Sequence, residues 1–141
     1  MAETRKQLEN FRLPTNLKLA LLWASLMSLY IYNDYFSMYL PGTIEDMTAG
    51  RIGPLGEATD LVFIGVSMLL AIPALMIFLS GVLPPLINRA LNIVLGLAYT
   101  AVEALTFIGS RPSYQIVVAF EIAVTLAIVW HALRWPKTSA N

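Results

Sequence analysis

The chain has 141 residues, which is enough for one domain. Hydrophobic residues make up 57% of it and charged residues 13%, against roughly 25% charged in soluble domains. The absence of cysteine excludes disulfides, thiol redox chemistry and cysteine-ligated metal or iron–sulfur centres. A formal net charge of zero argues against a nucleic-acid partner, which would require a basic surface.

Residues 1–16 are polar and charged, and they predict a short leader ahead of a long apolar region. An apolar stretch of about 18 or more residues predicts a transmembrane helix. Four such stretches follow, at residues 17–40, 61–83, 86–108 and 114–133. A soluble bundle would show a polar face at helical spacing, and the stretch LVFIGVSMLLAIPALMIFL has none. We therefore expect an all-α membrane protein, a bundle of four transmembrane helices at 17–135, followed by a tail at 136–141.

The basic residues predict the orientation of this bundle. One group belongs to the leader, the second loop and the tail: Arg5, Lys6, Arg12, Lys18, Arg89, Arg134 and Lys137. The first and third loops carry one each, Arg51 and Arg111. Loops retained in the cytoplasm are enriched in Lys and Arg. Both termini are therefore expected in the cytoplasm.

The loop at residues 41–59 is far longer than a tight turn requires. Thr43 followed by Glu45 and Asp46 predicts an N-cap and the acidic first turn of a short helix, with Gly50 as its end. We expect this segment, including Glu45, Asp46 and Arg51, to lie at the interface or to fold over the bundle as a lid.

Two features of the spans concern helix shape and packing. Pro73 lies in the middle of the second span and leaves the carbonyl of Leu69 without its helical donor, so we expect a kink there. A tolerated kink without a role is the simpler interpretation. Small residues recur at four-residue spacing in the first and fourth spans: Ala20, Ala24, Ser28, Ala119, Ala123 and Ala127. Such faces let helices approach closely in lipid, which favours a homo-oligomer, most simply a dimer.

Three acids are embedded in the spans: Asp34 within SLYIYNDYFSMYLPG in the first, Glu103 in the third and Glu121 in the fourth. At 1.5 Å per residue, they lie about 24, 21 and 20 Å above the basic residues at the cytoplasmic ends of their spans. In a hydrocarbon core of about 30 Å, these heights form one layer in the outer half. An embedded acid costs about 2.5–3.5 kcal/mol on insertion scales, so such residues normally face the protein interior or a water-filled cavity.

Polar neighbours extend this layer. Tyr30 precedes Asp34 by four residues and Tyr99 precedes Glu103 by four, so each phenol could hydrogen-bond the acid on its own helix face. Thr125 lies one turn below Glu121. The third span carries a stripe of polar and small residues: Asn88, Asn92, Gly96, Tyr99 and Glu103. The candidate ligand- or proton-binding residues are Asp34, Glu103, Glu121, Tyr30, Tyr99, Asn33 and Asn92.

No Lys or Arg is embedded at the height of the acids, and three carboxylates packed together cannot all ionise without mutual repulsion. Either some of them are protonated near neutral pH or a cation completes the site. The first case predicts a proton carrier, and the second predicts a ligand site for an amine or a metal ion. Acids that only hold helices together through hydrogen bonds are the structural alternative.

We expect no cofactor and no resident metal. The single histidine, His131, cannot supply bis-histidine haem ligation, and no Glu-x-x-His pair exists for a carboxylate-bridged di-iron site. A zinc hydrolase would require more nitrogen ligands than the chain has. No Gly-rich phosphate loop and no G-x-S-x-G motif occurs.

The segments YIYNDYFSMY, LPPLINRALNIVLG and FEIAVTLAIVWHALRW resemble a group of small prokaryotic four-span membrane proteins known as a domain of unknown function. The similarity runs from about residue 17 to residue 135. It implies a multi-pass protein of the inner membrane of a prokaryote, and it implies a fold without an activity. In architecture alone, the layout is also similar to the sterol-isomerase and sigma-2-receptor-like fold and to the small multidrug-resistance exporters. The long first loop and the position of Asp34 near the outer end depart from the exporters.

The leading hypothesis is a transporter- or receptor-like membrane protein with an acidic pocket in the outer half of the bundle. That pocket would bind a cationic or amphipathic ligand or exchange protons. The alternative is an accessory or assembly subunit of a larger membrane complex, whose acids meet basic residues of a partner. A membrane enzyme that acts on a lipid, with the acids as general acid and base, comes third.

Overall fold

A computed structural model of the chain describes residues 11–137. Most of the predicted leader and the end of the tail lie outside the described residues. Two of the basic residues that predict the orientation, Arg5 and Lys6, also lie outside them.

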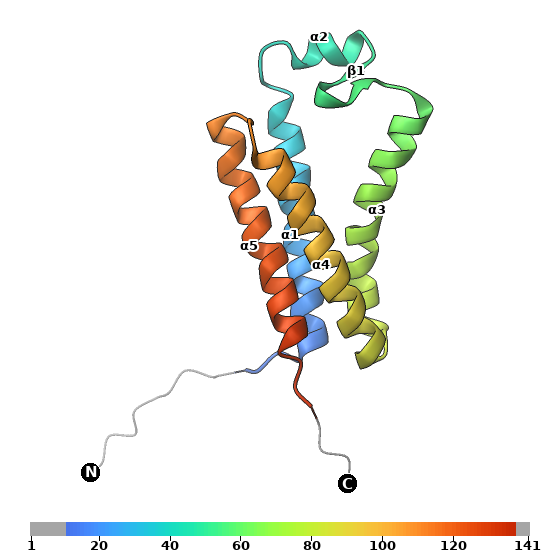
Figure 1. Ribbon diagram of the computed structural model, residues 1–141, viewed down its shortest axis with the longest axis vertical. Coiled ribbons are helices and arrows are strands. Elements are labelled where there is room, and N and C mark those ends of the chain that lie inside the picture. Colours follow the sequence, from blue (N-terminus) through green and yellow to red (C-terminus); the bar gives the residue numbers. More distant parts are fainter. Residues whose placement is uncertain (1–10, 138–141) are drawn as a thin grey trace, which may run out of the picture.

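The described chain is predominantly helical (Figure 1). Its long helices are α1 (Thr15–Ser37), α3 (Asp60–Val82), α4 (Pro85–Phe107) and α5 (Pro112–Leu133). Between α1 and α3 lie α2 (Thr43–Thr48), β1 (Arg51–Ile52), the 3-10 helix η1 (Gly53–Leu55) and β2 (Gly56–Glu57), with β1 and β2 paired antiparallel. The all-helical class is as predicted, and the ends of the long helices lie within three residues of the expected span boundaries.

Prolines and a threonine define where the long helices begin. Pro14 is the N-cap of α1, so Thr15 and Asn16 belong to that helix rather than to the leader. Helices α4 and α5 begin at a proline, whose fixed φ suits the first turn. Thr59 caps α3 by accepting a hydrogen bond from the backbone N–H of Val62 at 3.4 Å.

The expected cap of the short loop helix requires a correction. Helix α2 forms where predicted, but Thr43 is its first residue and Gly42 is its N-cap. Gly42 has φ 88°, a left-handed conformation that a residue with a side chain would adopt only under strain.

The long helices are arranged so that α5 packs against both α4 and α1, and α1 packs along α3. Helices α3 and α4 meet near the short turn that joins them and diverge towards the other end of the bundle (Figure 1). A core of buried, mainly apolar side chains lies between the helices, formed by Leu19, Trp23, Leu26, Met76, Tyr99, Ile128 and Ala132. Helices α4 and α5 approach closely at Gly96, where an added Cβ would lie 2.7 Å from Cγ2 of Val129.

The exterior of the bundle is apolar and much of its interior is polar. Leu61, Phe78 and Leu86 are 78%, 67% and 79% exposed. Several polar side chains are buried instead: Ser80, Asn88, Asn92, Glu103, Glu121 and Thr125. This distribution reverses that of soluble proteins and suits a lipid environment.

Among the described residues, α3, α4 and α5 are long and apolar enough to cross a membrane, and α1, of similar length but with more polar residues, is not one of these three. The chain is accordingly a helical membrane protein.

Candidate functional site

Glu103 on α4 and Glu121 on α5 are buried, each with 3% of its surface exposed. Both carboxylate oxygens of Glu103 accept hydrogen bonds. The Tyr30 hydroxyl on α1 donates to Oε1 at 2.6 Å, and the Thr125 hydroxyl on α5 donates to Oε2 at 2.9 Å. Thr100 Oγ1 lies 2.9 Å from Thr125 Oγ1 and can donate to it, which leaves the Thr125 proton for Glu103. Glu103 therefore joins three helices at one level.

Glu121 lacks this support. Its Oε1 is the single buried side-chain oxygen or nitrogen without a hydrogen-bond partner in the described part of the chain. Asn33 and Asp34 on α1, Tyr114 on α5 and Glu103 are near enough for their dipoles or charges to act on the Glu121 carboxyl. A buried polar atom without a partner costs about 1–3 kcal/mol. A ligand that donates a hydrogen bond would therefore gain the most binding free energy at Glu121 Oε1.

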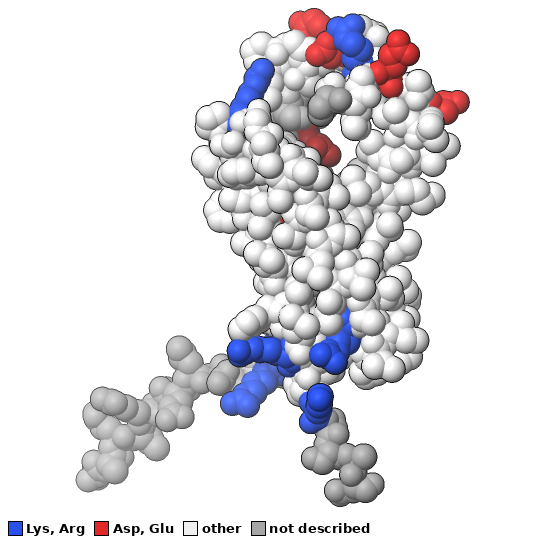
Figure 2. All heavy atoms as spheres, in the orientation of Figure 1, with Lys and Arg blue, Asp and Glu red and all other residues white. Residues whose placement is uncertain are grey.

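Asp34 occupies the rim of this cluster. It lies one turn above Tyr30 on the same face of α1, and its side chain is exposed rather than buried. Its charge still acts on Glu121 and Tyr114. Figure 2 shows acidic atoms at the back of an opening beneath the α2–β2 loop, between α3 and the α4–α5 pair. The structure therefore brings all three acids into one region, with two inside the bundle and one at its edge.

Both predicted tyrosine pairings differ from the structure. The Tyr30 hydroxyl reaches across to Glu103 instead of bonding Asp34 on its own helix. The Tyr99 hydroxyl donates to the backbone carbonyl of Leu69 on α3 instead of to Glu103. Pro73 supplies no N–H to that carbonyl, so the phenol fills a vacancy in the hydrogen bonding of α3. The proline therefore creates an acceptor that holds α4 to α3.

Asn92 does not belong to the acid cluster. It precedes Glu103 by eleven residues, or about 16 Å along the helix. The Trp23 indole donates to its Oδ1 at 2.7 Å, and its own amide donates to Asn88 Oδ1 at 2.7 Å and to Ser80 Oγ at 3.3 Å. All four side chains are buried. Asn92 thus completes a separate network that joins α1, α3 and α4.

The loop residues proposed for a lid lie outside the acid cluster. The Arg51 guanidinium pairs with Asp46, and this is the one ion pair among residues 11–137. Arg51 and Glu45 are exposed, and Asp46 is partly exposed. The loop crosses one end of the bundle from α1 to α3 (Figure 1). Arg51 is therefore engaged with its own loop and does not neutralise the embedded acids.

Two residues near these networks carried a usable signal in the sequence. Tyr114 precedes Glu121 by seven residues and Trp23 precedes Tyr30 by seven, and residues two helical turns apart share a face. The predicted candidate residues rested on four-residue spacing, so Tyr114 and Trp23 were not among them. Within residues 11–137, no three His, Asp or Glu side chains are arranged to hold a metal ion.

The sequence model of a family of unknown function, DUF6326, matches residues 9–141. The chain belongs to DUF6326. The expected resemblance to a domain of unknown function is thereby confirmed. No curated protein and no solved structure matches the chain. Membership of DUF6326 assigns no activity, so the function has to be inferred from the acid cluster itself.

Proposed function

We propose that this DUF6326 protein binds an organic cation at the acid cluster and exchanges it for a proton on Glu121. The observation that carries this proposal is the unpartnered, buried Oε1 of Glu121. With one oxygen buried and unpartnered and only Asn33 near enough to support the group, a carboxylate in that position would be an incompletely compensated buried charge, which is more costly than a neutral carboxyl. Glu121 therefore keeps a proton while the site is empty and releases it when a cation arrives.

The two buried carboxyls are suited to different tasks. Glu103 is fixed by Tyr30 and Thr125, so it serves as a stationary charge that positions the ligand. Glu121 has a free oxygen and titrates as the ligand enters and leaves. Asp34, at the exposed rim, attracts a cation to the opening.

The surroundings favour an amphipathic organic cation. Two tyrosines, Tyr30 and Tyr114, flank the acids, and aromatic faces attract ammonium groups by about 0.5–2 kcal/mol. No Lys or Arg pairs with any of the three acids in the described part of the chain. The opening lies beside α3, a helix that exposes many apolar side chains, so an apolar ligand body could enter from the lipid.

The proposal includes α1 as a fourth span. This helix has the same length, 23 residues, as α3 and α4, and it packs against α3 and α5. In Figure 2 basic atoms gather at the end of the bundle near the termini, and acidic atoms of the loop lie at the other end. By the positive-inside rule, both termini are cytoplasmic in a prokaryotic inner membrane, and the loop lies outside as a lid over the cluster.

We also propose that the protein forms a homodimer. Ala119 and Ala123 are exposed on one stripe of α5, where a second copy could approach closely. An accessory subunit of a larger complex and a lipid enzyme remain the alternatives from the sequence. The experiment below separates them.

The test is isothermal titration calorimetry of the full-length protein in detergent with 4-phenylbutylammonium, an amphipathic cation that can donate hydrogen bonds, and with 4-phenylbutanol as a neutral probe. We expect the cation to bind and the neutral compound not to bind. Glu121→Gln should weaken cation binding at least about tenfold, the equivalent of 1.4 kcal/mol. The matched control is Glu45→Gln, which removes an exposed acid of α2 and should change nothing.

Proton exchange gives a second readout of the same titration. The binding enthalpy should depend on the ionisation enthalpy of the buffer, because Glu121 releases a proton, and Glu121→Gln should abolish that dependence. Equal affinity for both probes, or an unchanged affinity in Glu121→Gln, would reject the proposal. A protein that is stable only with a co-purified partner would indicate an accessory subunit. Lipid turnover lost in Glu103→Gln would indicate an enzyme.

A further inference from the structure

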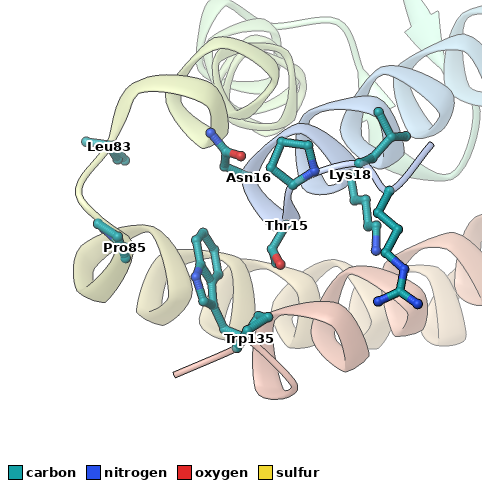
Figure 3. A pocket seen from close by; sticks show the side chains of 10 residues that line it. Thr15, Asn16, Lys18, Leu83, Pro85 and Trp135 are labelled. Carbon is teal, nitrogen blue, oxygen red and sulfur yellow. The ribbon is translucent and has the colours of Figure 1, made fainter. Parts of the chain in front are cut away.

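A second hollow lies at the opposite end of the bundle from the loop and is independent of the acid cluster (Figure 3). It has a volume of about 680 Å³. It lies between the start of α1, the turn from α3 to α4 and the segment after α5.

The charge of this groove is positive. Arg12 and Lys18 line it, and neither forms an ion pair within residues 11–137. Every acid in the described range belongs to the loop, to the start of α3 or to the acid cluster. On the face drawn in Figure 2, Lys and Arg atoms gather at this end without acidic atoms beside them. The groove therefore attracts an anion.

The walls supply a second kind of contact. Leu83 and Pro85 border the groove on one side, the start of α1 borders it on the other, and Trp135 lies between them (Figure 3). The hydroxyl of Thr15 and the amide of Asn16 add polar groups, the amide donating to the carbonyl of Gly81 at 3.3 Å. Cations beside an aromatic ring and apolar walls suit a ligand with an anionic head and an apolar body.

We propose that this groove binds the headgroup of an anionic phospholipid from the surrounding bilayer. The groove lies at the end of helices whose outer surfaces are apolar, which is the level at which phospholipid headgroups lie. Basic residues at that level attract anionic lipids. A free phosphate would use the two cations but would leave Leu83, Pro85 and Trp135 without a partner. The lipid is therefore the occupant that uses the whole lining.

Tryptophan fluorescence offers a direct test, because Trp135 lines the groove while the other two tryptophans, Trp23 and Trp130, do not. Full-length protein carrying Trp130→Phe is titrated in detergent with phosphatidylglycerol or phosphatidylcholine, each with brominated acyl chains that quench nearby indoles. Phosphatidylglycerol should quench at lower concentration than phosphatidylcholine. Because a basic residue near the membrane surface contributes about 1 kcal/mol, Arg12→Gln and Lys18→Gln should each reduce that preference about fivefold.

The matched control is Lys137→Gln, which removes one charge near the same end but outside the lining. It should leave the preference within about twofold of the parent, since exposed charges beyond the groove are screened by salt. An equal loss of the phosphatidylglycerol preference in Lys137→Gln would show that the preference comes from general surface charge, and it would overturn the proposal. Equal quenching by the two lipids in the parent protein would also overturn it. Displacement of the lipid by inorganic phosphate at constant ionic strength would show that the groove takes a free anion instead.

Discussion

Glu103 and Glu121 are two buried acids on adjacent helices with opposite hydrogen-bonding environments. Glu103 has donors on both oxygens, and Glu121 has a buried oxygen without a partner. Charge-assisted hydrogen bonds stabilise an ionised carboxylate, and their absence leaves a neutral carboxyl favoured. Two glutamates in one site can therefore differ in role: Glu103 can hold a stationary charge, and Glu121 can exchange a proton.

Removal of the phenol that supports Glu103 tests this contrast. Tyr30→Phe deletes the donor to Glu103 Oε1 while it keeps the ring, so it leaves a buried acceptor unsatisfied. We expect a loss of about 1–3 kcal/mol in the free energy of unfolding, measured by denaturation in mixed micelles. The control is Tyr32→Phe, because Tyr32 is 63% exposed two residues away. Equal losses in both variants would contradict the assigned role of Tyr30.

The acid cluster shows which contacts can be predicted from residue spacing and which cannot. A rise of 1.5 Å per residue was enough to predict that Glu103 and Glu121 approach each other, because both helices run through the same thickness. The partner of Tyr30 was not predictable in the same way. Spacing of four residues gives the face of a helix, but it does not give which neighbouring helix that face meets. Interhelical hydrogen bonds such as the one from Tyr30 to Glu103 depend on which helix lies opposite, and spacing along one helix does not give this.

At the scale of the elements, α3 and α4 are joined by a hydrogen bond that depends on a proline. With Pro73 present, Tyr99→Phe leaves the Leu69 carbonyl without a donor and should cost about 1–3 kcal/mol of unfolding free energy. With Pro73→Ala, the new N–H of residue 73 can donate to Leu69, so the same tyrosine substitution should cost less. A double-mutant cycle measures this coupling. Strictly additive costs would show that the phenol does not compensate for the proline.

Close contact between α4 and α5 gives a second element-level prediction. Gly96→Ala would place its Cβ 2.7 Å from Cγ2 of Val129, so it should destabilise the bundle although alanine is the better helix former. The control is Gly65→Ala on α3, where an added Cβ meets nothing within 4 Å, and there we expect a gain of up to about 1 kcal/mol. The combination of Gly96→Ala with Val129→Ala should recover part of the loss. A neutral Gly96→Ala would contradict the close packing.

Element boundaries were more predictable than element contacts. The first residues of α4 and α5 follow from prolines that favour a helix start. Pro73 and the carbonyl of Leu69 that it leaves without a helical donor could also be recognised in the sequence, but the donor that satisfies this carbonyl comes from a different helix. The N-cap of α2 was missed because Gly42 takes a left-handed conformation that composition alone does not reveal.

At the scale of the whole molecule, the bundle carries polar contacts through its length. The acid cluster joins α1, α4 and α5, the Asn92 network joins α1, α3 and α4, and Arg89 closes the basic end. The Arg89 Nε donates to the carbonyl of Ala132 in the last turn of α5 at 3.1 Å, a carbonyl that also accepts from the backbone N–H of Trp135. Arg89, one of the basic residues expected at the cytoplasmic end, therefore also ties α4 to α5. Helix α1 contributes to both larger networks. Whether α1 crosses the membrane therefore decides whether these networks lie within the bilayer.

The lack of native cysteine makes that position measurable. Single variants Phe11→Cys, Ala49→Cys and Lys137→Cys place a thiol before α1, between α2 and β1, and after α5. With four spans, a membrane-impermeant maleimide added to intact spheroplasts should label Ala49→Cys alone, and the other two should react only after lysis. The cysteine-free parent controls for background. Labelling of Phe11→Cys together with Ala49→Cys would mean that α1 does not cross. Asp34 and Tyr30 would then lie outside the bilayer, and the acid cluster could not form the membrane-embedded site proposed here.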